Sequence, residues 1–238
     1  MRASLPLLVI AGCGPGGEDL ELLPYPTTPV DWSPSPDAVC GVDTPLGSVL
    51  LGPWDDAGIG GAAAAGDLDG DGLADLALTV HAAETVLTAG FRVYRGVAGG
   101  VEDEAWVGVM GPPETQLGAS LAPLGDVDGD GVGDLAVGVQ TFETEPSPAS
   151  VELWLGGAAG LTPASWSAPG LSVAGIDADA DGLGDVVVGD VTARQVSLYL
   201  GRPGGPSTTF DAISGGDSGF GREVGPAGDL DGDGREEA

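Results

Sequence analysis

From about residue 46 onward, short apolar runs alternate with turns rich in glycine and aspartate. Three of these runs, at 76–80, 135–139 and 186–189, are built mainly from Val, Leu and Ala. They lack the 3.6-residue period of a helix and are bounded by turn-forming residues, a pattern typical of short strands. The sequence therefore predicts an all-β fold.

The strand-sized segments recur in a repeat of roughly fifty residues, a length typical of propellers, solenoids and arrays. A glycine-containing apolar segment (59–62, 117–120 and 220–223, degenerate at 170–172) precedes an acidic turn, and an apolar run follows it. A third segment, at 91–96, 151–156 and 196–201, carries an aromatic residue two positions before a glycine, and Trp106 and Trp166 lie further on. About four strand-sized segments per repeat predict the four-stranded blade of a β-propeller. We expect the recurring aromatic side chains to pack between blades rather than to form a ligand platform.

A nine-residue acidic stretch is the most regular part of the repeat. It has Asp at positions 1, 3 and 5, Gly at position 6 and an acidic residue at position 9, and its first residues are Asp67, Asp126, Asp177 and Asp229. The four acidic side chains and the backbone carbonyl of position 7 can surround one hard cation, while Gly at position 6 permits the sharp turn. The candidate metal ligands are Asp67, Asp69, Asp71, Leu73 and Asp75; Asp126, Asp128, Asp130, Val132 and Asp134; Asp177, Asp179, Asp181, Leu183 and Asp185; and Asp229, Asp231, Asp233, Arg235 and Glu237.

The alternative interpretation is that these stretches are acidic surface turns that bind nothing, because Asp and Gly favour turns for local reasons. Four copies of closely spaced carboxylates would repel one another without a cation, so metal binding is the preferred interpretation. Many flexibly held oxygen ligands favour calcium (Ca²⁺) over magnesium, with one structural ion per loop and up to four in all. An EF-hand or dockerin loop is excluded because position 12 is Leu78, Val137 or Val188 rather than Glu. Repeats-in-toxin loops and thrombospondin-like repeats are excluded by the absence of their short periods.

The composition and net charge of the chain exclude some classes of binding partner. The chain has 238 residues with 44 Gly and 19 Pro, which suits a β protein with many turns. Its net charge is −30, from 37 acidic residues against seven basic ones. Nucleic acid and anionic membrane surfaces are therefore excluded as partners. Two cysteines, Cys13 and Cys40, cannot form a disulfide framework.

The N-terminal 45 residues differ from the repeats. Residues 1–13 place one Arg before a short apolar run and end in Ile10-Ala11-Gly12-Cys13, which resembles a bacterial lipobox with Cys13 as the lipidated residue. The alternative is an uncleaved leader with an incidental cysteine. Residues 14–45 are rich in proline and predict a disordered, semi-extended tether. We expect a signal peptide over 1–13, a tether over 14–45 and repeats over 46–238. The localisation expected is a lipoprotein of the bacterial cell envelope, at the outer membrane or cell surface, or otherwise a secreted protein, with membrane contact only through the lipid anchor.

The repeats resemble the FG-GAP repeat of the integrin α-subunit propeller, which overlaps with the VCBS-type repeat. The resemblance rests on Phe/Ile/Leu-Gly before Gly-Asp-x-Asp-Gly-Asp-Gly-x-x-Asp, then Leu-Ala-Val-Gly and Val-x-Val-Tyr-x-Gly, and it covers roughly residues 46–238. It implies a β-propeller in which each calcium loop joins two strands of a blade. Three blades and the start of a fourth fall short of the usual seven, so we expect an incomplete chain, with part-propellers assembling between chains as the alternative. The third copy departs from the pattern at Ile176 and Ala180, and the fourth at Arg235 and Glu237.

The function expected is an exported, lipid-anchored, calcium-binding propeller that acts as an adhesion module and binds an extracellular protein or glycan. By resemblance, the ligand would bind the face away from the calcium loops, at segments such as 81–90 and 140–149. An enzyme is disfavoured because the chain has a single His, His81, and no nucleophile motif, and because Glu143 and Glu145 fit a solvated loop. The alternatives are a propeller attached to a secreted hydrolase or lyase, and an inert spacer.

Overall fold

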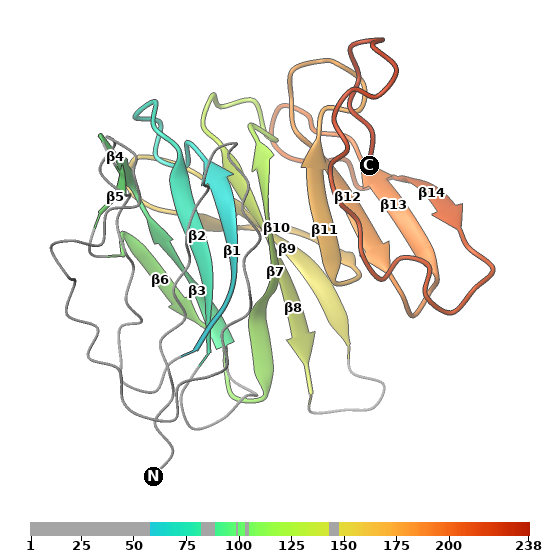
Figure 1. Ribbon diagram of the computed structural model, residues 1–238, viewed down its shortest axis with the longest axis horizontal. Coiled ribbons are helices and arrows are strands. Elements are labelled where there is room, and N and C mark those ends of the chain that lie inside the picture. Colours follow the sequence, from blue (N-terminus) through green and yellow to red (C-terminus); the bar gives the residue numbers. More distant parts are fainter. Residues whose placement is uncertain (1–57, 82–88, 99, 103–104, 143–147) are drawn as a thin grey trace, which may run out of the picture.

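The computed structural model describes residues 58–81, 89–98, 100–102, 105–142 and 148–238. The described residues form fourteen strands and no helix, so the all-β prediction is confirmed (Figure 1). The strands are β1 (Gly58–Gly66), β2 (Asp75–His81), β3 (Ala89–Tyr94), β4 (Gly96–Val97), β5 (Gly100–Val101), β6 (Val107–Met110), β7 (Thr115–Gly125), β8 (Asp134–Thr141), β9 (Ala149–Leu155), β10 (Thr162–Pro169), β11 (Ser172–Ile176), β12 (Asp185–Asp190), β13 (Gln195–Tyr199) and β14 (Asp211–Ser214). The predicted signal peptide and tether, including Cys13, lie outside the described residues.

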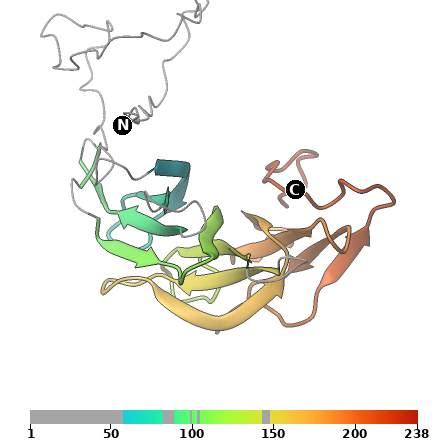
Figure 2. The same cartoon turned by 90° about the horizontal axis from the view of Figure 1, so that it is seen from below.

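Twelve of the strands form three antiparallel groups of four, which we call blades; the first two groups belong to one eight-stranded sheet. Blade 1 has the strand order β1-β2-β3-β6, blade 2 has β7-β8-β9-β10 and blade 3 has β11-β12-β13-β14. A single parallel pairing, Ala89 with Gln116, joins β3 to β7, and β4 with β5 forms a separate two-stranded ribbon. The blades stand side by side along an open arc (Figure 2). Within the described residues the arrangement is that of a part-propeller, as the repeat pattern predicts.

The first strand of blades 1 and 2 ends in a bulge before the acidic turn. Gly66 and Gly125 have φ angles of 72° and 70°, and the pairing register shifts at each of them. These angles lie in the left-handed region that glycine adopts without a steric cost. Blade 3 has Ile176 at this position, and β11 pairs with β12 without a register shift. The departure noted at Ile176 is therefore a local loss of the bulge, and the hairpin itself is preserved.

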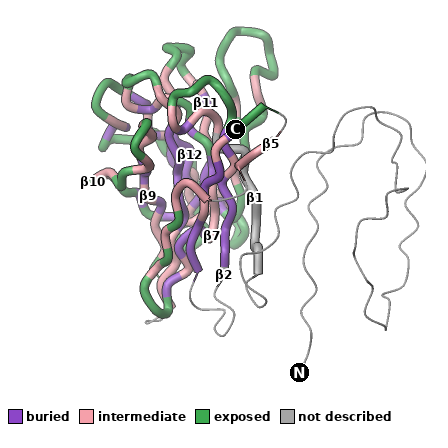
Figure 3. The backbone as a smooth tube through the Cα atoms, turned by 90° about the vertical axis from the view of Figure 1, so that its left-hand side faces the viewer, coloured by how far each residue is buried: buried purple, intermediate pink, exposed green. Residues whose placement is uncertain are grey.

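The hydrophobic cores lie between the blades. Phe91 of blade 1 meets Trp154 of blade 2 edge to face, with ring centroids 5.0 Å apart, in a cluster drawn from both blades. Trp166 of blade 2 meets Tyr199 of blade 3 at 5.2 Å in a second cluster. The buried strands are sandwiched in the interior, and exposed residues concentrate at the turns (Figure 3). The prediction that the recurring aromatic residues pack between blades is confirmed.

The side of blade 3 that faces away from blade 2 is less covered. All four residues of β14 are exposed, and Ile213 has an exposed fraction of 69%. The last acidic stretch is closed by an isolated bridge between Gly228 and Glu237, and its Leu230 is 72% exposed. The equivalent Leu68 is fully buried because blade 2 covers it. Among the described residues, the structure has no helix of the length and apolarity that a membrane crossing requires.

Candidate metal loops

The first three acidic stretches occupy the same place in each blade. They connect β1 to β2, β7 to β8 and β11 to β12, and the fourth lies between the bridged residues Gly228 and Glu237. We number them loops 1 to 4 and use positions 1 to 9 within each. β1, β7 and β11 run in the same direction, so the loops gather at the upper edge of the blades in Figure 1. The hairpin placement implied by the repeat resemblance is therefore correct.

The carboxylate at position 1 is held inside its own turn by backbone N–H groups. In loop 1, Asp67 Oδ1 accepts hydrogen bonds from the N–H groups of Gly70 (2.8 Å) and Asp71 (3.0 Å), and Asp67 Oδ2 accepts one from Gly72 (2.8 Å). Loops 2 and 4 repeat all three bonds, and loop 3 repeats those from positions 5 and 6. Backbone donors of this kind fix the direction of the carboxylate.

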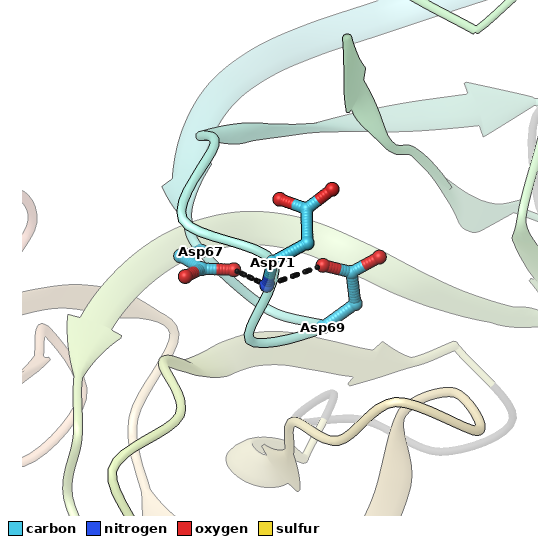
Figure 4. Close-up of side chains that lie close together, drawn as sticks. All are labelled: Asp67, Asp69 and Asp71. Carbon is cyan, nitrogen blue, oxygen red and sulfur yellow. Dashed lines mark hydrogen bonds between the residues drawn. The ribbon is translucent and has the colours of Figure 1, made fainter.

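The carboxylates at positions 3 and 5 are oriented in the same manner. Asp69 Oδ1 accepts the N–H of Asp71 at 3.1 Å, and Asp71 Oδ1 accepts the N–H of Leu73 at 2.8 Å. Figure 4 shows Asp67 and Asp69 on either side of the Asp71 backbone nitrogen, to which both are hydrogen bonded. Asp69 and Asp71 thus each keep one oxygen that is not hydrogen bonded to the turn.

Acidic oxygens converge in all four loops. In each loop three carboxylates offer oxygens that lie within 4.8 Å of one another: Asp67, Asp69 and Asp71; Asp126, Asp128 and Asp134; Asp177, Asp179 and Asp185; Asp229, Asp231 and Asp233. Oxygens that share a calcium ion sit about 2.3–2.6 Å from it, which places them within roughly 5 Å of one another. The donor set is entirely oxygen. The residues present therefore fit one hard divalent cation per loop.

The acidic residue at position 9 has a role that its spacing did not reveal. Asp134 is 1% exposed; its Oδ2 accepts the N–H of Val127 and its Oδ1 accepts that of Gly156, both at 2.9 Å. Asp75 and Asp185 make the same pair of bonds in their blades. Each carboxylate therefore ties the start of its loop to the end of the third strand.

Burial raises the pKa of these position-9 carboxyls. The pKa of Asp134 rises to about 6 because desolvation outweighs the two hydrogen bonds from Gly156 and Val127. Desolvation also raises the pKa of Asp75, Asp185 and the position-3 residue Asp128. A bound cation would favour the charged form of each of these groups.

A glycine shortly after the third strand of each blade leaves room for the loop. A Cβ atom on Gly156 would lie 2.1 Å from the carbonyl oxygen of Gly133, at position 8 of loop 2. The same clash would occur at 2.3 Å between Gly96 and Ala74, and at 2.3 Å between Gly201 and Gly184. The sequence shows these glycines as a recurring motif, and the close approach of the loop backbone explains why a larger residue would not fit there.

Successive loops are hydrogen bonded to one another. The N–H of Gly133 in loop 2 donates to the carbonyl of Asp67 in loop 1 at 2.8 Å, and that of Gly184 in loop 3 donates to Asp126 in loop 2 at 2.8 Å. The N–H of Glu236 in loop 4 donates to Asp177 in loop 3 at 2.9 Å. The bonded residues always occupy position 8 of one loop and position 1 of the loop before it. The loops therefore form a continuous chain across the blades.

Loops 3 and 4 depart from the pattern in ways that the structure explains. Ala180 stands where the other loops have glycine and adopts a φ of 59°, which carries a steric cost for a residue with a Cβ atom. Glu237 in loop 4 takes the position-9 role, since its Oε2 accepts the N–H of Leu230 at 2.8 Å. Glu236, which was not among the candidate residues, accepts the N–H of Asp177 through its Oε2 at 3.1 Å. The carbonyls of Leu73, Val132, Leu183 and Arg235 stay predictions as ligands.

Comparison with known proteins agrees with this geometry. The family described as FG-GAP repeat matches residues 59–91, which run from β1 through loop 1 into β3. This chain is an FG-GAP repeat protein. Its relatives include integrin alpha-7 of Mus musculus, with 30% identity over 169 residues, and integrin alpha-4 of Xenopus laevis, with 30% identity over 161 residues. Integrin alpha-IIb of Homo sapiens is 33% identical over 99 residues.

The chain spans only a small part of the length of the relatives it matches. The matches cover 65%, 60% and 37% of this chain, and 14%, 15% and 9% of the respective relatives. Loops 1 and 2 and the blades around them have the same hydrogen bonds, although the family match itself covers only the first repeat. The geometry of loop 1 therefore recurs in loop 2, outside the residues that the family match covers.

Proposed function

We propose that this FG-GAP chain is an exported, non-enzymatic, calcium-binding propeller module that binds an extracellular protein or glycan as an adhesion module. The observation that carries the proposal is the convergence of three carboxylates in each of four loops placed at equivalent positions of successive repeats. The similarity to integrin alpha chains supports an extracellular location. The lipobox-like residues before Cys13 support a bacterial lipid anchor, which belongs to the same proposal.

Calcium would have a structural role in this module. Without a cation, three carboxylates within 4.8 Å of one another repel each other in every loop. Since position 1 also bonds the next loop through its backbone carbonyl, a cation that holds the Asp67 side chain in place also steadies the junction between blades 1 and 2. β1 and β7 lie close together at this junction, so the cation would stabilise packing as well as the turn.

The ligand would bind at the opposite end of the blades. The connections from β2 to β3 and from β8 to β9 lie at that end, and residues 82–88 and 143–147 within them fall outside the described residues. In blade 3 the equivalent connection is a short turn in which Asp190 Oδ1 accepts the N–H groups of Thr192 and Ala193. A ligand face separate from the cation loops allows calcium to stabilise the module without contacting its partner.

Thermal unfolding of the chain, with calcium or with excess chelator, tests the metal proposal. Extracellular calcium sites have dissociation constants of about 10⁻⁴–10⁻³ M. At about 10 mM calcium, each site would add about 1.4–2.7 kcal/mol to the free energy of unfolding. For a chain of this size, each site that is lost in the same unfolding transition as the rest of the protein would raise the Tm by about 3–10 °C. Coincident melting curves in calcium and in chelator would contradict the proposal, and magnesium alone serves as the specificity control.

Binding of immobilised glycans and extracellular matrix proteins by the calcium-loaded chain tests the ligand proposal. Saturable binding that chelator abolishes would support an adhesion module. Absence of binding by a chain that calcium stabilises would instead favour the spacer function, while leaving the metal proposal intact.

A further inference from the structure

We propose that Arg95 lowers the cation affinity of loop 1 below that of loops 2 and 3, so that the loops fill in order. The inference rests on the proposed calcium binding and concerns one side chain that distinguishes blade 1 from its neighbours. Loop 1 would then fill at higher calcium concentrations than loops 2 and 3.

Arg95 stands directly beside loop 1. It lies between the last residue of β3 and Gly96, and its Nη1 is 3.7 Å from Oδ2 of Asp69, the position-3 carboxylate. The Asp69 side chain is 6% exposed, whereas that of Arg95 is 38% exposed. A cation in loop 1 would share the Asp69 carboxylate with the guanidinium.

Other side chains hold the guanidinium in this place. Its Nη2 donates to Glu102 Oε1 at 3.1 Å and its Nε donates to Glu102 Oε2 at 3.2 Å, in a two-bond arrangement that suits a planar guanidinium. Its central carbon lies 5.9 Å from the ring centroid of Trp106, within the range of a cation–π contact. Arg95 is therefore a positioned charge rather than a free surface side chain.

Blades 2 and 3 bring no charge to the same position. The strand ends Tyr94-Arg95-Gly96, Trp154-Leu155-Gly156 and Tyr199-Leu200-Gly201 are equivalent, because each glycine donates its N–H to the position-9 carboxylate of its blade. Leucine thus stands where blade 1 has arginine. Replacing Arg95 by leucine reproduces the local sequence of two natural neighbours.

The positive charge of Arg95 stabilises the metal-free loop and destabilises the cation-loaded loop. In the metal-free loop, the guanidinium offsets part of the repulsion among the carboxylates. In the loaded loop it repels the cation: charges of +1 and +2 roughly 6 Å apart in a water-like medium correspond to about a tenfold loss of affinity. The Glu102 carboxylate offsets part of this, so we expect Arg95 to weaken binding about three- to tenfold.

Calorimetric calcium titration of the whole chain tests the inference. Asp71→Asn keeps the oxygen that accepts the Leu73 N–H and identifies the step of the titration that belongs to loop 1. Arg95→Leu should strengthen that step about three- to tenfold at low salt, and the gain should shrink at about 1 M salt, where the screening length is about 3 Å. Arg222→Leu removes the same charge from an exposed position and should leave the step unchanged.

A reciprocal substitution and a melting experiment complete the test. Leu155→Arg should weaken the step of loop 2, and Arg95→Leu should lower the Tm in chelator while increasing the gain that calcium provides. An unchanged affinity of loop 1 in Arg95→Leu, in a parent chain that does bind calcium, would overturn this inference alone. A parent chain that binds no calcium would overturn both this inference and the proposed metal function.

Discussion

Replacing Gly156 by alanine tests the packing of loop 2 against the third strand of blade 2. The added Cβ would lie 2.1 Å from the carbonyl oxygen of Gly133 and 2.7 Å from that of Leu68, both of them backbone atoms. A Cβ atom essentially never approaches a neighbour closer than 3.0 Å, so the strand end and the loop must separate by nearly 1 Å. No side-chain rotation can relieve this contact.

The cost of Gly156→Ala has two sources. Inserting a methyl group into a filled space costs about 1–3 kcal/mol. Moving the strand end away also stretches the 2.9 Å hydrogen bond from the Gly156 N–H to the buried Asp134 carboxylate, and a bond to a charged group contributes about 1.5–3 kcal/mol. The free energy of unfolding should therefore fall by about 3–5 kcal/mol, which corresponds to a Tm lower by about 6–20 °C.

The neighbouring glycine provides a matched control. A Cβ on Gly157 would have its nearest neighbour at 3.9 Å, the carbonyl oxygen of Gly160. Gly157→Ala should therefore leave the Tm unchanged or raise it slightly, because it restricts the unfolded chain. Both variants are melted in excess calcium and followed by circular dichroism. If Gly156→Ala melts within about 2 °C of the parent chain, the close approach of loop and strand is refuted.

Three further substitutions test the core, the junctions and the metal loops. Phe91→Ala removes a fully buried ring and should lower the free energy of unfolding in urea by about 3–5 kcal/mol; a loss below about 1 kcal/mol would contradict the inter-blade core. Gly184→Ala, whose Cβ would lie 1.7 Å from the carbonyl oxygen of Leu124, should lower the Tm more than Gly133→Ala, whose Cβ would lie 2.9 Å from that of Asp67. The reverse order would count against the close packing of each loop on the preceding blade. Asp128→Ala should reduce the calorimetric calcium stoichiometry by one; an unchanged stoichiometry would argue against loop 2 as a site.

The blades and the position of the loops were predictable from the sequence because both depend on local patterns that repeat. Short apolar runs bounded by turn residues predict strands, and the recurrence of Trp154 and Tyr199 at one repeat position predicts packing between blades. The carboxylates at positions 1, 3 and 5 were recognisable because the spacing of ligands along a turn is itself a local property.

The contacts that fasten one loop to another were not predictable from the sequence. They are made by backbone groups, such as the Gly133 N–H and the Asp67 carbonyl, which every residue possesses and which leave no mark in the sequence. The two backbone hydrogen bonds of Asp134 were not predictable either, because a carboxylate that accepts backbone N–H groups and one that binds a cation look alike in the sequence. The charge of Arg95 becomes meaningful only when the fold places it beside Asp69.

The chain of bonded loops explains why a cation in one loop would act on the junction between two blades. The carbonyl of Val132 is a predicted ligand in loop 2, and the N–H of Gly133 belongs to the same peptide group. That N–H donates to the carbonyl of Asp67, whose side chain is a predicted ligand in loop 1. A cation that draws electron density from the Val132 carbonyl makes the attached N–H a stronger donor, since hydrogen-bonded groups polarise one another. Calcium in loop 2 would therefore strengthen the bond to loop 1 without touching it, and stability would depend on neighbouring loops being filled together.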